Sequence, residues 1–426
     1  MSQNIIASEI ENSSGQVARA QPDGLADSLI RVNGLSYRMP SNMSVVVSRS
    51  LKRSYANLDQ YRQNGKVIIT LNSGSEYILG PTSYLTFDLQ TVGAGSSATF
   101  ESGSVTNIID NVTINSVNGT EIDRVESVNL YNRNNDRWTY SQNYIDNFAS
   151  VMGYKSSEAG VTNPLATVTD SPKRYCIPLS KLSPVHNNYV LMPSMMAGGL
   201  RYEIKLASYD TAFKNGVVAP SDYLISNVSI MVDSFQLADS IQKRLMMESA
   251  NNGLEYHFTT YDRTRHNIVN SSKAFVTVRK AVSRALSAFA VTRLTNNVAL
   301  NTEDSMASET NNVKRMFWRL GSLNFPNQPL FSKSEQYIYA QRAWKKMIRP
   351  HKDNSVSYDD FTKDEGLVAV DLERSSVLSL SGLPVNNSRQ LQVEIDYDTA
   401  TSRDLDVFMH YLSLARVFPT NILMKE

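Results

Sequence analysis

The stretch NIIDNVTINSVNGTEIDRV, residues 107–125, begins with the pattern of a β-strand. Ile108, Val112 and Ile114 would share one face of an extended chain, and the polar side chains between them would share the other. Because successive side chains of a strand point to opposite faces, this alternation predicts one buried face and one face in water.

The second half of the stretch turns at Asn118-Gly119, a pair that strongly favours a hairpin. A competing signal follows, since Thr120 has the side chain of a helix N-cap and Asp123 stands three residues later. We find no returning strand in the pattern, and we predict that the turn leads into a helix beginning near Thr120. The sequence therefore predicts a helix inserted into a chain of strands.

Most of the remaining chain repeats short strand-like runs separated by turn residues. The alternation is clear in RYEIKLAS, residues 201–208, where Tyr202, Ile204 and Leu206 would point inward. It is clearest in LQVEIDYD, residues 391–398, whose apolar residues all fall on one face. Many short strands, frequent turns and few helices predict an all-β fold of the sandwich or barrel class.

Changes in composition divide the chain into four parts. Residues 1–40 are polar without sustained periodicity, and we interpret them as an N-terminal arm that is ordered only by its neighbours. Residues 41–238 form a first strand-rich unit, and residues 254–426 form a second one with a short C-terminal tail. Residues 239–253 between them are polar at both ends and weakly helical, and we interpret them as a linker.

The two strand-rich units resemble each other in the order of their elements, which indicates a duplication. RYEIKLA corresponds to QLQVEIDY, and SNVSIMVDSFQLA corresponds to LDVFMHYLSLARV as the last strand of each unit. The opening stretch has its counterpart in RLGSLNFPNQPLFSKSEQYIYAQRAWKKM, residues 319–347, which predicts strand, turn and helix. Ser332 and Glu335 form a predicted capping box there, and Trp344 stands late in this segment as Trp138 does in the first.

Two polar segments interrupt the rhythm of strands, at residues 139–172 and 296–312. Both are poor in large apolar side chains. Segments of this kind usually run over the surface, because a buried loop carries backbone polar groups that are hard to satisfy. We therefore expect both to be surface excursions.

This layout resembles the double jelly-roll major capsid proteins, a family that includes adenovirus hexon and the coat proteins of tailless membrane phages, virophages and polinton-like viruses. The resemblance covers about residues 41–420 and rests on the strand-to-helix segments of both units and on the strand pairs that end each unit. It implies two tandem eight-stranded antiparallel jelly-roll β-sandwiches, each with an inserted short helix. The family carries no catalytic signature.

For function, the resemblance implies a major capsid protein of the virion. Three chains would form a pseudo-hexameric homotrimeric capsomer, and capsomers would tile the icosahedral shell of a double-stranded DNA virus. The implied partners are copies of the chain, neighbouring capsomers, and minor capsid or penton proteins. The N-terminal arm would reach a neighbour, an internal protein or an inner membrane.

The composition limits the partners and the compartment. The 42 basic and 41 acidic residues give a net charge of +1, which argues against wholesale or sequence-specific binding of nucleic acid. Cys176 is the one cysteine, so no intramolecular disulfide can form. The sequence shows neither the pattern of a secretory signal nor an apolar run of the roughly 18 residues needed to span a membrane. We expect assembly in the reducing interior of the host cell.

Two motifs resemble chemical sites but lack an essential part. GAGSSA, residues 93–98, fits a glycine-rich phosphate-binding pattern, but turn and strand residues follow it where a phosphate cradle needs a helix. A calcium loop centred on Gly119 would place Ile114 and Val125 at liganding positions, and neither side chain can bind a cation.

The remaining candidates are single residues and one basic cluster. The chain contains five histidines, namely His186, His257, His266, His351 and His410. We interpret them as surface or strand residues outside any zinc motif, and Cys176 as a small core residue. Residues 341–352 could face nucleic acid or an anionic membrane, but a helix with a solvated cationic face and with Trp344 and Ile348 packed inward is favoured. We predict no catalytic, cofactor-binding or metal-binding residues, no cofactor and no enzymatic activity.

Two other functions fit an all-β chain. A minor capsid or vertex protein usually needs a single jelly roll. A carbohydrate-binding β-sandwich, as in lectins and fibres, would need a cleft with clustered aromatic side chains and paired carboxylates. Trp138, Trp318 and Trp344 instead fall in or near the predicted helical segments, which favours the major capsid protein.

Overall fold

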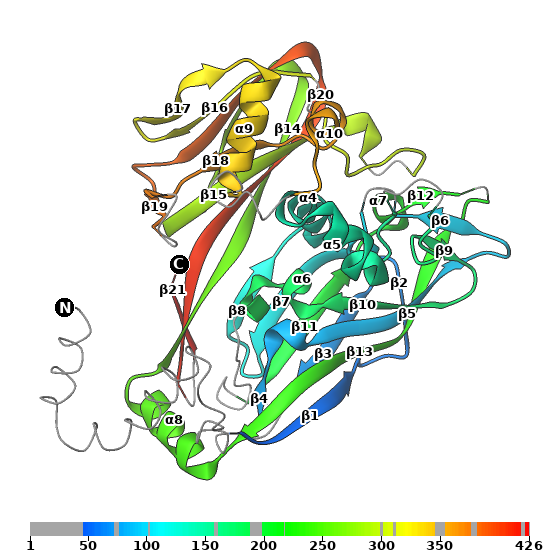
Figure 1. Ribbon diagram of the computed structural model, residues 1–426, viewed down its shortest axis with the longest axis vertical. Helices are drawn as coiled ribbons and strands as arrows, with labels where there is room; N and C mark the ends of the chain where they lie inside the picture. The colour runs from blue at the N-terminus through cyan, green and yellow to red at the C-terminus, as the bar shows by residue number, and fades with distance from the viewer. Residues whose placement is uncertain are drawn as a thin grey trace, which may run out of the picture.

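The computed structural model describes most of the chain from residue 46 onward. The described residues are 46–71, 76–100, 103–156, 161–187, 198–216, 218–298, 301–309, 312–345, 354–375, 381–418 and 422–425. They form two strand-rich bodies, blue to green and green to red in Figure 1, with helix α4 (Val128–Thr139) between them. The predicted N-terminal arm, residues 1–40, lies outside the described residues.

Eight strands build the first body as two facing sheets. One sheet has the order β1 (Val46–Tyr55), β13 (Asp222–Leu237), β5 (Tyr84–Val92) and β10 (Lys173–Pro178), and the other has the order β3 (Lys66–Leu71), β11 (Leu200–Leu206), β7 (Ile109–Ser116) and β8 (Glu121–Val125). All neighbours are antiparallel. If these eight strands are renumbered 1 to 8 in chain order, the first sheet has the order 1-8-3-6 and the second has the order 2-7-4-5. This is the jelly-roll order, and it confirms the fold expected for the first unit.

The second body repeats this order with longer strands. β14 (Leu254–Thr277) and β20 (Leu391–Val417) pair along their length, and their register shifts between Ile268 and Lys273. One sheet consists of the first part of β14, the last part of β20, β15 (Val282–Leu294) and β18 (Val368–Asp371). The facing sheet consists of the last part of β14, the first part of β20, β16 (Val313–Leu320) and β17 (Leu323–Leu330). With β14 and β20 each counted as two strands, the second unit is also an eight-stranded jelly roll.

Shorter elements decorate the two sandwiches. The remaining strands are β2 (Gln60–Arg62), β4 (Tyr77–Ile78), β6 (Ser97–Thr99), β9 (Thr167–Thr169), β12 (Lys214–Asn215), β19 (Leu383–Val385) and β21 (Ile422–Lys425). The remaining α-helices are α5 (Gln142–Asp146), α6 (Leu179–Leu182), α7 (Tyr209–Ala212), α8 (Asp239–Asn251), α9 (Lys333–Ala343) and α10 (Tyr358–Lys363). The 3-10 helices are η2 (Gly80–Thr82), η3 (Val105–Ile108), η4 (Phe148–Met152), η5 (Pro184–Asn187) and η7 (Thr295–Asn297). α8 occupies most of the predicted linker, and Figure 1 places it at the lower end of the molecule.

The predicted course of the chain after Asn118-Gly119 is wrong, because a returning strand does follow. The turn closes the β7–β8 hairpin, with Val112 opposite Val125. Asp123 is buried in β8 where an apolar side chain would be expected, and this hides the alternation of the strand. The helix starts at Val128 and not near Thr120.

The second unit contains the same supersecondary motif, a hairpin followed by a helix. β16 and β17 form the hairpin, and α9 follows with Ser332 at its N-cap. The predicted capping box is wrong, because the Ser332 side chain makes no capping bond and contacts Ser334 Oγ at 2.9 Å. A capping box instead opens α10, between Ser357 and Asp360. Both jelly rolls therefore insert a helix after the same hairpin, as the duplication predicts.

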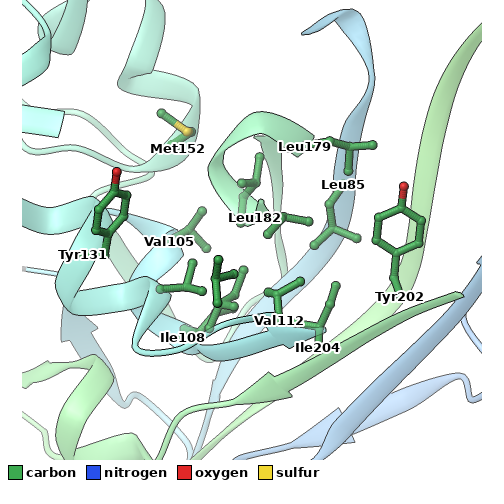
Figure 2. Close-up of a cluster of buried hydrophobic side chains, with 14 of the residues drawn as sticks. Leu85, Val105, Ile108, Val112, Tyr131, Met152, Leu179, Leu182, Tyr202 and Ile204 are labelled. Carbon is green, nitrogen blue, oxygen red and sulfur yellow. The ribbon is translucent and has the colours of Figure 1, made fainter. Parts of the chain in front are cut away.

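The alternation predicted for the clearest strands is confirmed. Tyr202, Ile204 and Leu206 are buried in β11, and the four apolar residues of 391–397 are buried in β20. Figure 2 shows how strands from both sheets supply the first core, with Leu85 of β5 and Ile204 of β11 among its side chains and Tyr131 of α4 at its border.

Neither polar insertion is simply a surface excursion. Residues 139–172 contain α5, η4 and β9, and they bury Met152 and Tyr154 in the first sandwich. Residues 296–312 bury Met306, and the Ser305 hydroxyl donates to the Thr211 carbonyl of the first sandwich at 3.1 Å. A few apolar anchors and well-placed hydrogen bonds suffice to bury a mostly polar segment.

Gly119 gives the first test of this architecture. Its φ is +91°, and a Cβ added there would meet nothing within 4 Å, so a larger side chain would suffer backbone strain but no clash. Gly119→Val should lower the free energy of unfolding by about 1–2 kcal/mol, because a β-branched residue disfavours positive φ. Chemical denaturation measures this. Gly119→Asn, which tolerates positive φ better, is the control, and equal stability of the Val variant and the unsubstituted protein would contradict the role given to this turn.

Candidate functional site

The two sandwiches meet across a sheet that is buried on both faces. In β15, Ala288 and Ala290 face the core of the second sandwich, whereas Phe289 and Val291 belong to the core of the first. β20 behaves in the same way, since Val407 packs into the second core and its neighbour Phe408 into the first. The hydrophobic core of the first sandwich thus continues into the second, and we call this contact the seam.

Helix α4 places an aromatic side chain at the centre of the seam. The Tyr131 ring stacks on Tyr261 of β14 with a centroid distance of 3.7 Å and an interplanar angle of 10°. Phe408 lies edge-on to the same ring at 5.7 Å. The Tyr131 hydroxyl is hydrogen-bonded to His410 Nε2 at 2.8 Å, and Ser287 Oγ lies 2.8 Å from Nδ1 of that ring. Aromatic packing and a directional polar contact therefore act at one point.

The two tryptophans predicted to occupy equivalent positions stack on each other. Trp138 lies near the end of α4 and Trp344 caps the end of α9, with their ring centroids 5.2 Å apart. Trp138 Nε1 donates to the Glu365 carbonyl at 3.2 Å, and Trp344 Nε1 donates to Asn135 Oδ1 at 3.1 Å. Equivalent places in a duplication do not require contact, so this pairing could not be read from the sequence.

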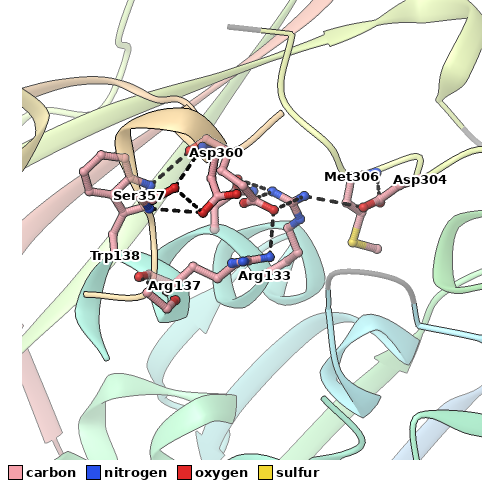
Figure 3. A network of polar contacts seen from close by, with 10 residues as sticks. Arg133, Arg137, Trp138, Asp304, Met306, Ser357 and Asp360 are labelled. Carbon is pink, nitrogen blue, oxygen red and sulfur yellow. Dashed lines mark hydrogen bonds and ion pairs between the residues drawn. The ribbon is translucent and has the colours of Figure 1, made fainter. Parts of the chain in front are cut away.

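A buried ionic network crosses the seam beside this stack (Figure 3). Arg133 of α4 is completely buried and donates to both carboxylate oxygens of Glu365, at 2.8 and 3.0 Å. Arg137 donates to the same carboxylate at 2.8 Å, and Asp304 lies 3.4 Å from Arg133. Burial raises the pKa of Glu365, and the two guanidinium groups oppose that rise.

Such a network specifies orientation more than it adds stability. Removing two charges from water costs several kcal/mol, and their mutual attraction offsets this only with good geometry. The two-pronged contact between Arg133 and Glu365 supplies that geometry. The sequence contained no local signal for it, because the two residues are 232 positions apart.

A second buried carboxylate crosses the seam at β8. Asp123 accepts hydrogen bonds from Thr260 of β14, at 2.8 Å, and from Ser183. Burial raises the pKa of Asp123 to about 6, although both hydroxyl groups oppose the rise. This explains why a carboxylate occupies an inward position of β8, since it bridges the two sandwiches.

Two cavities open along the seam. One has a volume of about 280 Å³ and is bounded by β8, β14 and β20, with Asp123 in its wall. The other has about 310 Å³ and is bounded by α4, β15 and the end of α9, with Tyr131 and His410 in its wall. Their mixed polar linings suit ordered water. Among the described residues, no group of three or more His, Cys, Asp or Glu could hold a metal ion.

The motifs that resembled chemical sites have structural roles. Residues 93–98 turn from β5 into β6, and the Gly95 backbone N–H donates to Asp170 Oδ2 at 2.8 Å. No helix begins there, so the turn lacks the helix N-terminus that a phosphate cradle needs, and β6 pairs with β9 and β12. Ile114 and Val125, which would be the ends of a calcium loop, are both buried in the β7–β8 hairpin.

Two single-residue interpretations are corrected. His186 is neither a surface nor a strand residue: it is fully buried in η5, its ring stacks on Tyr202, and burial lowers its pKa to about 3. Cys176 is not a core residue: it lies on the outer face of β10, 3.6 Å from Thr86 Oγ1, and is partly exposed. The strand period itself places Cys176 on the face opposite the buried Tyr175 and Ile177, whereas neighbours in space bury His186.

The other histidines and the basic cluster agree with the sequence where they are described. His257 and His266 are exposed on β14, and His410 lies in β20, while His351 is outside the described residues. α9 ends at Ala343, earlier than the predicted pattern, and Trp344 packs inward as predicted. Lys345 pairs with Glu373 at 2.8 Å. Residues 346–352 of the cluster lie outside the described residues.

Comparisons with known proteins match the fold. No protein-family profile and no curated protein sequence matches the chain. The quasi-atomic model of the PBCV-1 virus capsid matches with a TM-score of 0.64 at 13% identity, over 92% of this chain and 99% of that one. The Faustovirus major capsid protein matches with 0.62 at 8% identity, over 91% and 94%. The mavirus major capsid protein matches with 0.50 at 10% identity, over 92% of each. The chain thus has the double jelly-roll fold of these capsid proteins.

The ionic network makes the first prediction at the seam. Glu365→Ala should destabilise the protein by about 3–5 kcal/mol, because it removes the two-pronged carboxylate partner of the buried Arg133 and leaves the longer contact with Asp304. The double variant Arg133→Met/Glu365→Leu should recover most of that loss. Asp359→Ala, which breaks an exposed ion pair with Lys363, is the control and should cost less than about 1 kcal/mol. Denaturant unfolding measures all three, and an equal loss in the single and double variants would contradict this account.

The seam also predicts two opposite pH dependences. Burial lowers the pKa of His410 to about 4, so its contribution is present above the unfolded pKa of about 6.5 and is lost as pH falls toward 4. The raised pKa of Asp123 acts in the opposite sense, since its contribution is present below about pH 4 and is lost as pH rises through 6.

The pH-dependent contribution of each group to the free energy of unfolding is about 3 kcal/mol, so the contributions of His410 and Asp123 nearly cancel in the unsubstituted protein. When the pH is lowered from 7 to 4, the stability of His410→Gln should rise relative to that of the unsubstituted protein, and the stability of Asp123→Asn should fall relative to it. Urea unfolding at both pH values checks the signs, and a common sign for the two variants would refute the assignment.

Proposed function

We propose that this chain is a major capsid protein that builds the icosahedral shell of a double-stranded DNA virus. The observation that carries the proposal is the pair of complete jelly rolls fused across one continuous core. The chain covers nearly the whole length of the capsid proteins whose fold it shares. Its location would be the virion capsid.

The seam supports this function mechanically. A shell unit must keep its shape while neighbours press on it from several sides. Here the second sandwich cannot move relative to the first without exposing Phe289 and Phe408 or separating Arg133 from Glu365. Each loss costs several kcal/mol, so the two sandwiches behave as one rigid block.

Three such blocks form the proposed capsomer, a homotrimer of six sandwiches with a pseudo-hexagonal outline. The near-neutral charge of +1 lets copies approach without strong repulsion. Further proposed partners are neighbouring capsomers, minor capsid and penton proteins, and an inner membrane or internal protein reached by residues 1–40. Among the described residues, no helix has the length and apolar character needed to cross a bilayer. We place the first jelly roll at residues 41–238, the linker at 239–253 and the second jelly roll at 254–426.

We further infer that the chain is a structural protein and not an enzyme, and that it assembles without a cofactor in the reducing interior of the host cell. The alternatives are weaker. A minor capsid or vertex protein needs one jelly roll, whereas this chain has two. A carbohydrate-binding sandwich needs open aromatic platforms, whereas Trp138 and Trp318 are fully buried and Trp344 is covered by Trp138 and Phe289.

Size-exclusion chromatography with light scattering tests the proposal directly. The purified full-length chain should elute as a species of three times its 47.6 kDa mass, and negative-stain images should show a hexagonal outline. A stable monomer at high protein concentration would overturn the proposal.

A further inference from the structure

A buried lysine and a buried aspartate meet between α4 and α6. Lys181 Nζ lies 2.5 Å from Asp136 Oδ1. The Lys181 side chain is 6% exposed and the Asp136 side chain is 1% exposed. Among the residues that the structure describes, Lys181 is the one buried lysine. The fold therefore keeps this amine and this carboxylate out of water together.

Neighbouring side chains hold both groups in place. Asn132, one turn before Asp136 in α4, donates to the Lys181 backbone carbonyl at 2.7 Å and so fixes α6 against α4. The Tyr154 hydroxyl donates to the other carboxylate oxygen, Asp136 Oδ2, at 2.8 Å. The Tyr140 ring faces the lysine, with 4.1 Å between Nζ and the ring centroid. The amine and the carboxyl group are thus fixed on both sides.

This arrangement places a nitrogen nucleophile next to a carboxyl carbon. A carbon–oxygen bond is about 1.2 Å long, so Lys181 Nζ lies at most about 3.7 Å from Asp136 Cγ. Well-oriented reacting atoms are held at about 3–3.5 Å, and such positioning replaces an encounter in solution. Because two buried charges are costly, transfer of one proton from the ammonium to the carboxylate relieves that cost. The resulting neutral pair is an amine beside a carboxylic acid.

We propose that Lys181 and Asp136 join in an isopeptide bond, a covalent amide between the two side chains. One proton moves from Nζ to Oδ1, and the neutral amine attacks Cγ. The negative charge that develops on Oδ2 is stabilised by the Tyr154 hydroxyl, which already donates to that oxygen. Oδ1 then leaves, with its proton and a second proton from Nζ, as one water molecule. The ammonium and the carboxylate become one amide and one water, and no other reactant is needed.

The surroundings of the pair favour the product. The cavity of about 310 Å³ between α4, β15 and the end of α9 has both Asp136 and Lys181 in its wall, so the released water has a way out. The amide that remains carries no charge, and its burial costs less than that of an ion pair. Escape of the water and loss of two buried charges both favour the bond.

The bond would close the chain between residues 136 and 181, a segment that includes the polar insertion at residues 139–172. A covalent link that closes a long loop stabilises a fold by restricting the unfolded chain. Cys176 is the one cysteine, so no intramolecular disulfide can do this. An amide resists reduction and would hold the insertion in a reducing compartment as well. The inference concerns this link alone and does not depend on the capsid function.

Intact-mass spectrometry and a tryptic map of the purified full-length chain test the proposal. The chain should weigh less than its sequence by the mass of one water. Trypsin should leave the acylated Lys181 uncut and yield residues 134–137 joined to residues 175–201 as one branched peptide. Lys363 and Asp359, an exposed pair also 2.5 Å apart, are the internal control and should stay unlinked. A chain of full mass, or a loss of water without this branched peptide, would overturn the proposal.

Two variants separate the bond from the ion pair. Lys181→Arg keeps a positive charge beside Asp136, but a guanidinium stays protonated and is no nucleophile, so this variant should keep the full mass of its sequence. Asp136→Asn should release ammonia in place of water, and its linked product should have the same mass as the linked unsubstituted chain. Circular dichroism checks that both fold.

The variants also identify the reacting residues. Loss of one water from either folded variant would assign the reaction to other side chains, and the proposal would then be wrong. The tryptic map of the unsubstituted chain needs no variant, so the test holds even if a substitution prevents folding.

Discussion

The structure depends on one constraint, which is that the β14-β20-β15-β18 sheet is buried on both faces where the two sandwiches meet. An ordinary sandwich sheet buries one face, and its strands alternate between apolar and polar residues. Here both faces need apolar side chains, because one meets its own sandwich and the other meets the first sandwich. Phe289 and Ala290 are neighbours in β15, yet they belong to different cores. The two sandwiches are thereby made into one body.

Burial of apolar area alone would not fix how the two sandwiches sit, because hydrophobic contact is not directional. The polar groups of the seam supply direction. Arg133 meets Glu365, Asp123 meets Thr260, and Tyr131 meets His410, each at hydrogen-bonding distance. A shift of one residue would leave these groups buried without partners, at a cost of about 1–3 kcal/mol or more for each.

Much of the fold could be predicted from local patterns. Alternation in residues 201–208 and 391–398 identified strands correctly, and the repeated order of elements predicted two jelly rolls. Two of the errors share one cause, which is a polar residue that is buried by distant partners. Asp123 hid the strand β8 and made a hairpin look like the start of a helix. Polar segments such as residues 296–312 looked like surface loops, although Met306 and Ser305 anchor them to the first sandwich.

The sequence by itself determined the two jelly rolls, their order and the absence of a recognisable chemical motif, because these follow from the period of apolar residues and from local spacing. The strands around the seam even carried a signal in short apolar runs, AFAV at residues 288–291 and VFM at residues 407–409, which one-sided burial does not need. Only the tertiary structure decided which surfaces meet, that Trp138 stacks on Trp344, and that Arg133 finds Glu365. Contacts between residues hundreds of positions apart depend on how whole sheets pack, and no local period records that.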